Sequence, residues 1–257
     1  MKKMLICTIV FFTLVKSSFA LLSNHDIPVE EPIKILKDFN SFLNYMGENL
    51  KLSEDFTAYN TYSKIISKGT FLKMLTSGDY LPLRLRSTDN KLYFKLYRYN
   101  VLIGKDIRGS TQGWAQVFYE HYERQGKKFP AFNFVDLNGH IYNKETTKGK
   151  VIVLKCWFIG CPICEKEIPA LNKLVKKYKN RMDIIFVSLA PDSKKKLQIF
   201  LKKKRFDYAE VPNQNTFMSK ELNVNAFPTH FIINKQGIIV SVVDTPEEID
   251  YALKNKI

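Results

Sequence analysis

The alternation of apolar and polar positions predicts an order of strands and helices in the C-terminal half of the chain. Residues 151–154 form a continuous apolar run, which is typical of a strand buried on both faces. Apolar side chains then recur at helical spacing over residues 163–175, with charged residues between them. A second buried strand is predicted at residues 183–190, and the connection between the two strands is right-handed by the general rule for βαβ units. Because the apolar period resumes at Leu171, we expect Pro169 to kink the helix and not to end it.

The rest of this half continues the alternation of strands, turns and helices. The pattern predicts an extended segment at 129–137, a tight turn at Asn138-Gly139, a strand at 140–142, a helix at 194–204, a strand or loop at 208–211, a helix at 216–222, a hairpin of 231–233 with 238–243, and a last helix that opens at Pro246. Strands that alternate with helices before a terminal hairpin predict an α/β sandwich with a mixed sheet.

Residues 21–125 are predicted to form a smaller α+β module. The pattern gives one helix from Pro32 to Gly47, a short helix at 71–75, a β-hairpin of 80–86 with 91–99, and a helix at 111–125. No motif that carries chemistry stands out in this module. Packing is the simplest use of its aromatic residues, and docking of a substrate or partner is the alternative. The polar stretch at 125–128 is the predicted boundary, and a second domain is expected at 127–257.

The first twenty residues have the pattern of a secretory signal peptide. Lys2 and Lys3 precede an apolar run at residues 4–15, and residues 18–20 resemble a small-x-small cleavage site, so we expect cleavage after Ala20. The run is too short for a typical membrane span, although an uncleaved N-terminal anchor is the alternative. The sequence therefore predicts an exported protein of the periplasm.

The chain of 257 residues has a formal net charge of +15. Its lysines concentrate at residues 173–179, 194–196 and 202–205, each on an amphipathic helical pattern, so we interpret these clusters as solvated helix faces. This interpretation and the predicted export argue against a nucleic-acid partner. A basic surface also suits acidic proteins or an anionic membrane surface, which leaves peripheral membrane association open.

Two cysteines, Cys161 and Cys164, lie where the first buried strand ends and the helix begins. Unpaired N–H groups in the first turn of a helix stabilise negative charge, so we expect a lowered pKa for the Cys161 thiol. Cys164, one turn further on, would resolve the mixed disulfide in thiol–disulfide exchange. A zinc site needs four ligands and a structural disulfide with so short a loop gains little stability, so both alternatives are weaker. The one other cysteine after the predicted signal peptide, Cys156, is expected to be a buried inert thiol, which leaves one redox pair that a partner keeps reduced.

Four segments, in this order, resemble the thioredoxin-fold domain of the periplasmic TlpA/ResA-like thiol-disulfide oxidoreductases. They are FPAFNFVDLNGHIY, WFIGCPICEKEIPAL, DIIFVSLAPD and NAFPTHFIINKQGII. The resemblance implies a thioredoxin-like fold for residues 127–257, with a mixed central sheet flanked by helices. It implies a cis Pro228 opposite the cysteine pair, to which an ordinary trans proline at a strand entry is the alternative. Glu167 matches the acidic residue that the family has three places after the second cysteine; as a buried carboxylate it would accept the proton of Cys164, and an exposed acid at the helix start is the alternative. It also implies an enzyme that reduces protein disulfides with its own cysteines, without a cofactor or metal, and that takes electrons from a membrane-embedded thiol protein.

Two positions depart from the family pattern. Gly160 stands where the family often has a tryptophan, which should leave the approach to Cys161 more open. The Pro162-Ile163 pair between the cysteines differs from the Gly-Pro pair of thioredoxin, so the redox potential and the direction of exchange stay open.

Further residues near the motif are candidates for the site. Lys155 is the single charge in a buried strand, and we hypothesise that it pairs with Glu167 beneath the second cysteine and tunes the thiols; outward snorkelling is the alternative. Trp157 either packs under the active-site loop or contacts the substrate. Phe227 and Thr229, on either side of the expected cis-proline, are predicted to bind substrate, the backbone of Phe227 by pairing with an added strand.

A metal-binding function is the second hypothesis. His230 lies two residues past the expected cis-proline and is most simply a histidine of the sheet. With Cys161 and Cys164 it would complete a three-ligand Cu(I) site, because thiolates and imidazole suit that ion. This hypothesis describes a copper-binding or metallochaperone protein.

Overall fold

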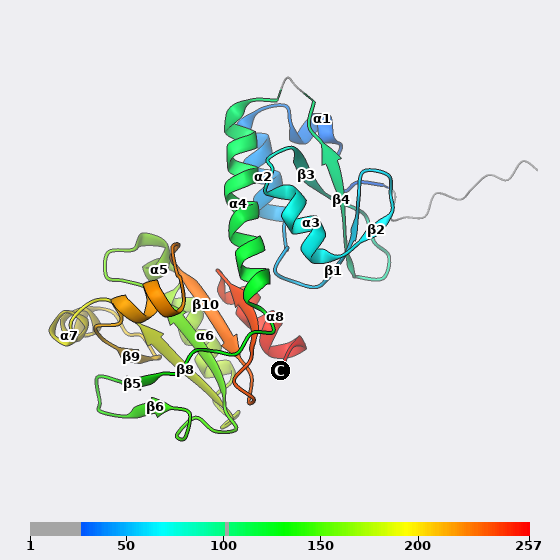
Figure 1. Cartoon of the computed structure of the whole chain (residues 1–257). Helices are drawn as coiled ribbons and strands as arrows, with labels where there is room; N and C mark the ends of the chain where they lie inside the picture. Colours follow the sequence, from blue (N-terminus) through cyan, green and yellow to red (C-terminus); the bar gives the residue numbers. More distant parts are fainter. Residues whose placement is uncertain (1–26, 101–102) are drawn as a thin grey trace, which may run out of the picture.

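The computed structural model describes residues 27–100 and 103–257 of the chain. The predicted signal peptide lies outside the described residues. The described part is an α/β structure with one sheet in each half of the chain and a separate two-stranded hairpin (Figure 1). In these two stretches, no helix combines the length and the apolar character needed to cross a bilayer.

A five-stranded mixed sheet forms the centre of the C-terminal half, with the strand order β11-β10-β7-β8-β9. Its strands are β7 Val151–Cys156, β8 Ile184–Leu189, β9 Ala209–Val211, β10 Thr229–Ile233 and β11 Ile239–Val243. β7, β8 and β9 are parallel, whereas β10 is antiparallel to both β7 and β11. Every residue of β7 is buried, which agrees with the apolar run at residues 151–154 and extends to Lys155 and Cys156. The predicted α/β fold with a mixed sheet is confirmed.

Helices cover one face of this sheet, and a hairpin with a π-helix covers the other. The covering elements are α5 Pro162–Lys166, α6 Ile168–Lys177, α7 Lys194–Lys203 and α8 Pro246–Asn255 on the first face, and β5 Asn133–Val135, β6 Ile141–Asn143 and the π-helix η2 Phe217–Glu221 on the second. Leu171, Leu197 and Ile249 pack into the core of the first face, and Phe134 and Met218 into that of the second.

The helix after β7 differs in detail from its prediction. The sequence predicted one helix kinked by Pro169, whereas the structure has two helices, α5 and α6, that meet at Glu167. Glu167 keeps a right-handed helical backbone, with φ −81° and ψ −15°. Pro169 lies in the first turn of α6, where its missing N–H leaves no hydrogen bond unmade.

A four-stranded sheet with the order β2-β1-β4-β3 forms the centre of the N-terminal half. The predicted hairpin is confirmed as the antiparallel pair β3 Tyr80–Arg84 and β4 Leu92–Arg98. The strands β1 Phe56–Tyr59 and β2 Ile65–Ile66 were not predicted, because such short runs show too few alternations to be recognised. β1 is parallel to β4, so its place depends on a partner that is distant in the sequence.

The helix predicted from residue 32 to residue 47 is two helices, α1 Pro32–Ile35 and α2 Phe39–Asn49. The carboxylate of Asp38 accepts a hydrogen bond from the Ser41 N–H at 2.8 Å and so caps the start of α2. The prediction that Gly47 ends the helix was wrong, because this residue lies inside α2. The short helix predicted at 71–75 corresponds to α3, which spans Lys68–Leu75.

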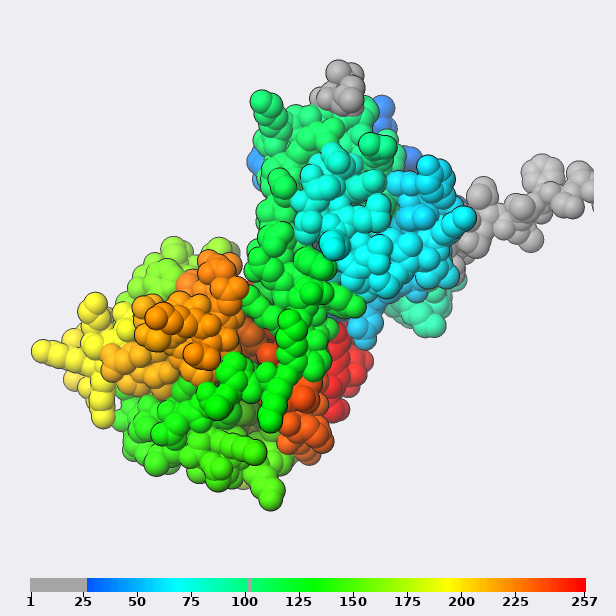
Figure 2. Space-filling view, in the orientation of Figure 1, coloured from blue at the N-terminus to red at the C-terminus, as the bar shows by residue number. Residues whose placement is uncertain are grey.

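The two halves of the chain contact each other along α4 and α8. α4 spans Lys105–Arg124, begins before the predicted residue 111, and packs against β11 (Figure 1). Near its C-terminal end, Arg124 Nη2 donates a hydrogen bond to the Asn223 carbonyl at 2.8 Å. The Ser53 hydroxyl donates to the Glu248 carboxylate of α8. Figure 2 shows the N-terminal half in contact with the C-terminal half, with α4 at the junction between them.

Candidate active site

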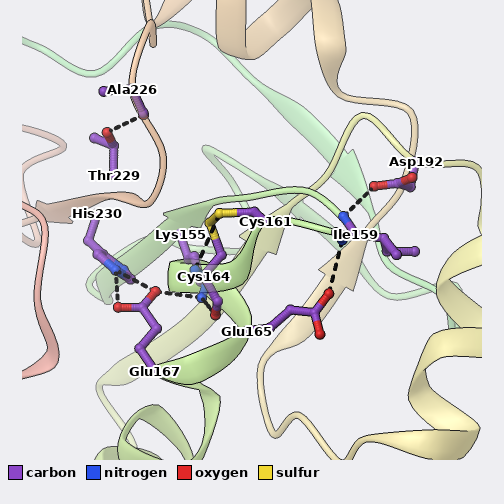
Figure 3. The surroundings of a disulfide bond; sticks show 11 residues. Lys155, Ile159, Cys161, Cys164, Glu165, Glu167, Asp192, Ala226, Thr229 and His230 are labelled. Carbon is purple, nitrogen blue, oxygen red and sulfur yellow. Dashed lines mark hydrogen bonds and ion pairs between the residues drawn. A yellow bond between two sulfur atoms is a disulfide. The ribbon is translucent and has the colours of Figure 1, made fainter.

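Cys161 and Cys164 form a disulfide at the start of α5, the helix that follows β7 (Figure 3). Cys161 is the N-cap residue of α5, and the Cys164 N–H donates a hydrogen bond to Cys161 Sγ at 3.3 Å. Cys161 is 5% exposed, whereas Cys164 is fully buried. Cys161 is therefore the sulfur that an incoming substrate can reach.

The loop between β7 and α5 is held in place by two acidic side chains (Figure 3). The Ile159 N–H donates to Asp192 Oδ2 at 2.9 Å, and the Gly160 N–H donates to Glu165 Oε1 at 2.9 Å. Gly160 has φ +92°, a conformation that residues with a side chain rarely adopt, which explains the glycine. A Cβ atom at Gly160 would meet nothing within 4 Å, so the space next to this residue is open.

Three buried side chains form a hydrogen-bonded network next to the disulfide (Figure 3). Lys155 Nζ lies 2.6 Å from Glu167 Oε1 and donates to the Cys164 carbonyl at 2.9 Å. His230 Nε2 lies 3.1 and 3.3 Å from the two oxygens of Glu167. The side chains of Lys155 and His230 are 0% exposed and that of Glu167 is 8% exposed. The predicted Lys155–Glu167 pair is therefore present, and Lys155 does not snorkel to solvent.

The register of the sheet brings this network together. His230 on β10 pairs with Lys155 on β7, Lys155 pairs with Ser188 on β8, and Ser188 pairs with Glu210 on β9. Side chains that are directly opposite in neighbouring strands point to the same face of a sheet. These four buried polar residues therefore form one row across the sheet, at the end of β7 that leads to the disulfide.

Trp157 belongs to this buried region and not to the surface. Its Nε1–H donates to Ser188 Oγ at 3.0 Å, and the Ser188 hydroxyl donates to Glu210 Oε2 at 2.6 Å. The indole also packs against the rings of Phe200 and Phe206. Trp157 is 0% exposed, so the structure contradicts the predicted substrate contact and supports packing beneath the active-site loop.

Burial and charge act in opposite directions on the network. Burial alone would raise the pKa of the Glu167 carboxyl, but the hydrogen bonds and charges of His230 and Lys155 outweigh it and hold this pKa below its ordinary value. Burial lowers the pKa values of Lys155 and His230, against the effect of Glu167. Burial raises the pKa of Glu210 to about 8. The row and Glu167 together therefore combine an ionised Lys155–Glu167 pair, a neutral His230 imidazole and, at neutral pH, a protonated Glu210 carboxyl.

The segment before β10 lies beside the active-site loop. The Phe227–Pro228 peptide bond is cis, as the resemblance implied. The Phe227 ring packs edge-to-face against Phe158, with 5.3 Å between the ring centroids. Phe227 is half-buried and stays a candidate for substrate contact. The Thr229 side chain is 2% exposed and its hydroxyl donates to the Ala226 carbonyl at 2.9 Å, so the structure contradicts a substrate contact through this side chain (Figure 3).

Two exposed apolar residues of the motif were not singled out from the sequence. Phe158 is 36% exposed and Ile163 is 65% exposed. Ile163 lies between the two cysteines in the first turn of α5, and Phe158 lies in the loop that leads to Cys161. The available signal was their apolar character at a helix start and in a loop, where polar residues are more common.

The structure does not bring together the ligands that the copper hypothesis requires. His230 points to Glu167 and not to the sulfurs (Figure 3). Among residues 27–100 and 103–257, no group of three or more His, Cys, Asp and Glu side chains is arranged to hold a metal ion. Cys156 is a fully buried free thiol whose pKa is raised by burial, which agrees with the predicted inert role.

Comparison with known proteins gives consistent similarities. Residues 125–242 match a model of the AhpC/TSA family. The thiol-disulfide oxidoreductase ResA of Bacillus cereus (strain ATCC 10987) is 30% identical over 168 residues, which cover 64% of this chain and 96% of that protein. The thioredoxin-like protein YneN of Bacillus subtilis is 25% identical over 137 residues, which cover 51% of this chain and 79% of that protein. A solved thiol-disulfide oxidoreductase from Bacteroides fragilis aligns at 18% identity with a TM-score of 0.46, over 51% of this chain and 100% of that one.

Proposed function

The chain belongs to the TlpA/ResA-like family of thiol-disulfide oxidoreductases, and from this premise we propose that it is an exported reductase of protein disulfides. Residues 127–257 carry the reaction in this proposal, with Cys161 and Cys164 as the only redox group. The observation that supports it most is the pair of sulfurs at the start of α5, one slightly exposed and one buried above an ion pair.

The first step is the attack of Cys161 on a substrate disulfide. In the reduced protein the Cys161 thiolate accepts the hydrogen bond of the Cys164 N–H and lies at the positive end of α5. It forms a bond to one substrate sulfur, and the other substrate sulfur leaves as a thiolate that takes a proton from water. The product is a mixed disulfide between Cys161 and the substrate.

The second step is the release of the substrate by Cys164. Its thiol gives its proton to the Glu167 carboxylate, and the sulfur attacks Cys161 Sγ. The Cys161–Cys164 bond forms while the bond to the substrate breaks, and the substrate sulfur leaves as a thiolate that takes up the proton from Glu167, directly or through water. The two protein thiols thus supply the two electrons that reduce the substrate disulfide. The Lys155 ammonium, 2.9 Å from the Cys164 carbonyl, stabilises the buried thiolate while Glu167 holds the proton.

The exposed apolar residues beside the sulfurs support a protein substrate. Ile163 and Phe158 offer apolar surface on the loop and helix that flank Cys161, and Phe227 lies against Phe158. We propose that the cysteine-bearing segment of the substrate lies over these side chains and pairs with the backbone at Phe227 as an added strand.

Export and electron supply complete the proposal. The predicted signal peptide supports export to the periplasm, where oxidising conditions would keep the cysteine pair as a disulfide. A reductase in such a compartment needs a donor of electrons, and we propose a membrane-embedded thiol protein for this role.

Reduction of insulin disulfides, together with equilibration against glutathione, tests the proposed function. The wild-type protein should accelerate insulin reduction by dithiothreitol, and Cys161→Ser and Cys164→Ser should both abolish this acceleration. Cys156→Ser is the matched control and should retain it, because this thiol is buried on the other face of the sheet. A Cys161→Ser variant with full activity, or a pair that glutathione reduces completely, would contradict a disulfide reductase.

A further inference from the structure

Glu167 is held by two donors from two different strands. Lys155 of β7 contacts Oε1, and His230 of β10 contacts both Oε1 and Oε2. The ion pair with Lys155 has a place in the proposed reaction, whereas His230 has none so far. A histidine that is 0% exposed nevertheless has a cost of burial, which an apolar residue in the same strand position would avoid.

The contacts of the imidazole define which nitrogen matters. Because an ionised carboxylate only accepts hydrogen bonds, Nε2 must carry the hydrogen that points to Glu167. Nδ1 is buried and has no hydrogen-bond partner in the described part of the chain. The ring therefore contributes one hydrogen bond, from Nε2 to Glu167, and contacts no other polar group through its ring nitrogens.

Without this donor, Glu167 would be fixed by one contact alone. Lys155 Nζ is shared between Glu167 Oε1 and the Cys164 carbonyl, so it holds only one of the two carboxylate oxygens. Among the residues that the structure describes, the second oxygen contacts His230 alone. His230 thus fixes the plane of the carboxylate and stabilises its ionised form.

We propose that His230 is a positioning residue for the second step of the reaction: its Nε2–H holds the Glu167 carboxylate in the orientation and charge state in which it accepts the proton of Cys164. This inference rests on the proposed function and adds a residue to it. In the step itself, the Cys164 S–H bond breaks, the proton binds to a Glu167 oxygen, and the sulfur pair displaces the substrate sulfur from Cys161. His230 stays neutral and keeps its own proton throughout.

Other titratable and charged groups surround Glu167 and His230, and they contribute to the pH dependence of any rate measured for the second step. They come from every element packed against the network: Lys155 on β7, Lys204 after α7, Tyr208 and Glu210 at β9, Asp244 after β11, Glu248 on α8 and His121 on α4. Variants of the same residue that differ only in their reach to Glu167 leave all these groups in place. Their comparison therefore isolates the contact made by Nε2.

The test separates the two steps with the aromatic disulfide DTNB and the full mature chain in its reduced form. Attack by Cys161 releases one coloured thiolate, and attack by Cys164 releases the second, so stopped-flow absorbance gives a rate for each step. The variants are His230→Gln, whose amide nitrogen takes the place of Nε2, and His230→Asn, whose shorter side chain takes the place of Nδ1. Ile232→Ala is the control, because it opens a cavity on the same strand and face without touching Glu167.

We expect His230→Asn to leave the rate of the first release unchanged and to slow the second release by about tenfold to a hundredfold, because the carboxylate that receives the proton is no longer held in position. In the pH profile of the second-release rate, the acidic limb should move to higher pH by about one to two units, because the Glu167 carboxylate is easier to protonate without this hydrogen bond. His230→Gln should restore most of the rate and the profile. Ile232→Ala should lower stability and leave the ratio of the two rates unchanged.

The inference would be overturned if the second release had the same rate in His230→Asn and His230→Gln, or if His230→Asn slowed both releases by the same factor. The same holds if the profile of His230→Asn coincides with that of the wild type. The proposed function fails separately, because a wild-type protein that gave no first release would refute the role of Cys161 whatever His230 does.

Discussion

Replacement of Lys155 by methionine provides the sharpest test of the buried ion pair. The change keeps an unbranched chain of similar length and removes the ammonium that lies 2.6 Å from Glu167 Oε1 and 2.9 Å from the Cys164 carbonyl. The side chain is 0% exposed, so water cannot take the place of the lost charge. Breaking a buried pair in this way costs about 3–5 kcal/mol. For a chain of this size that is a fall in Tm of roughly 6–20 °C.

The pH dependence of this loss has a definite sign. In the wild type the pKa of Glu167 lies below its ordinary value of 4.5, so the pair stabilises the fold above that pH and this contribution disappears as the pH falls through the lowered pKa. Without Lys155, burial is the largest effect and should raise the pKa of Glu167. Stability then declines as the pH rises. The loss relative to wild type should therefore be largest near pH 8 and smallest near pH 4.

The assay is urea unfolding of the oxidised protein at both pH values. Lys166→Met, which changes an exposed lysine at the end of α5, is the control and should leave the free energy of unfolding almost unchanged. The double variant Lys155→Met/Glu167→Gln should recover much of the loss, because no unpaired charge stays buried. Equal losses for Lys155→Met and Lys166→Met, or a loss that does not change between pH 4 and pH 8, would refute the reasoning.

Two further predictions follow from exposed and buried residues near the site. Ile163→Ser should raise KM for protein substrates about fivefold, since it removes roughly 1 kcal/mol of apolar contact, and should leave the rate with DTNB unchanged; an unaltered KM would argue against docking over this side chain. Glu210→Gln should make the protein more stable than the wild type at pH 8 and equal to it at pH 4. The pKa of Glu210 in the folded protein, about 8, lies above its ordinary value of 4.5, so the free energy of unfolding of the wild type falls by about 1 kcal/mol per pH unit between these values. If urea unfolding gave the same stability difference between the two proteins at pH 4 and pH 8, this assignment would be contradicted.

Four strands of the C-terminal sheet could be predicted from the sequence because they contain apolar runs that turns or helices separate, whereas the three-residue β9 was predicted only as a strand or loop. β7 is buried throughout and β8 is buried or partly buried along its length, so their apolar signal does not depend on which neighbours they have. β1, with four residues, has no such signal, and its parallel pairing with β4 depends on a distant segment. The division between α1 and α2 was predictable in principle, since Asp38 is a residue type that commonly caps helices.

The site was predicted as far as local spacing allows. The helix start at Cys161 follows from the change of period after the apolar strand. The pairing of Lys155 with Glu167 was inferred from the single charge in that strand. The contact between His230 and Glu167 could not be inferred in this way, because it depends on the register between β7 and β10, which no local pattern specifies. For the same reason the burial of Trp157 beneath the loop could not be predicted from the sequence, which left packing and substrate contact as two possible roles.

The most direct test of the central claim is to trap the covalent intermediate. In Cys164→Ala the first step can proceed and the second cannot, so a substrate protein with a disulfide should accumulate as an adduct. We predict that mass spectrometry of this adduct finds the substrate sulfur on Cys161 alone, and that Cys161→Ala gives no adduct under the same conditions. An adduct on Cys164 in the Cys161→Ala variant, or no adduct in Cys164→Ala with any disulfide protein, would contradict the assignment of Cys161 as the attacking sulfur.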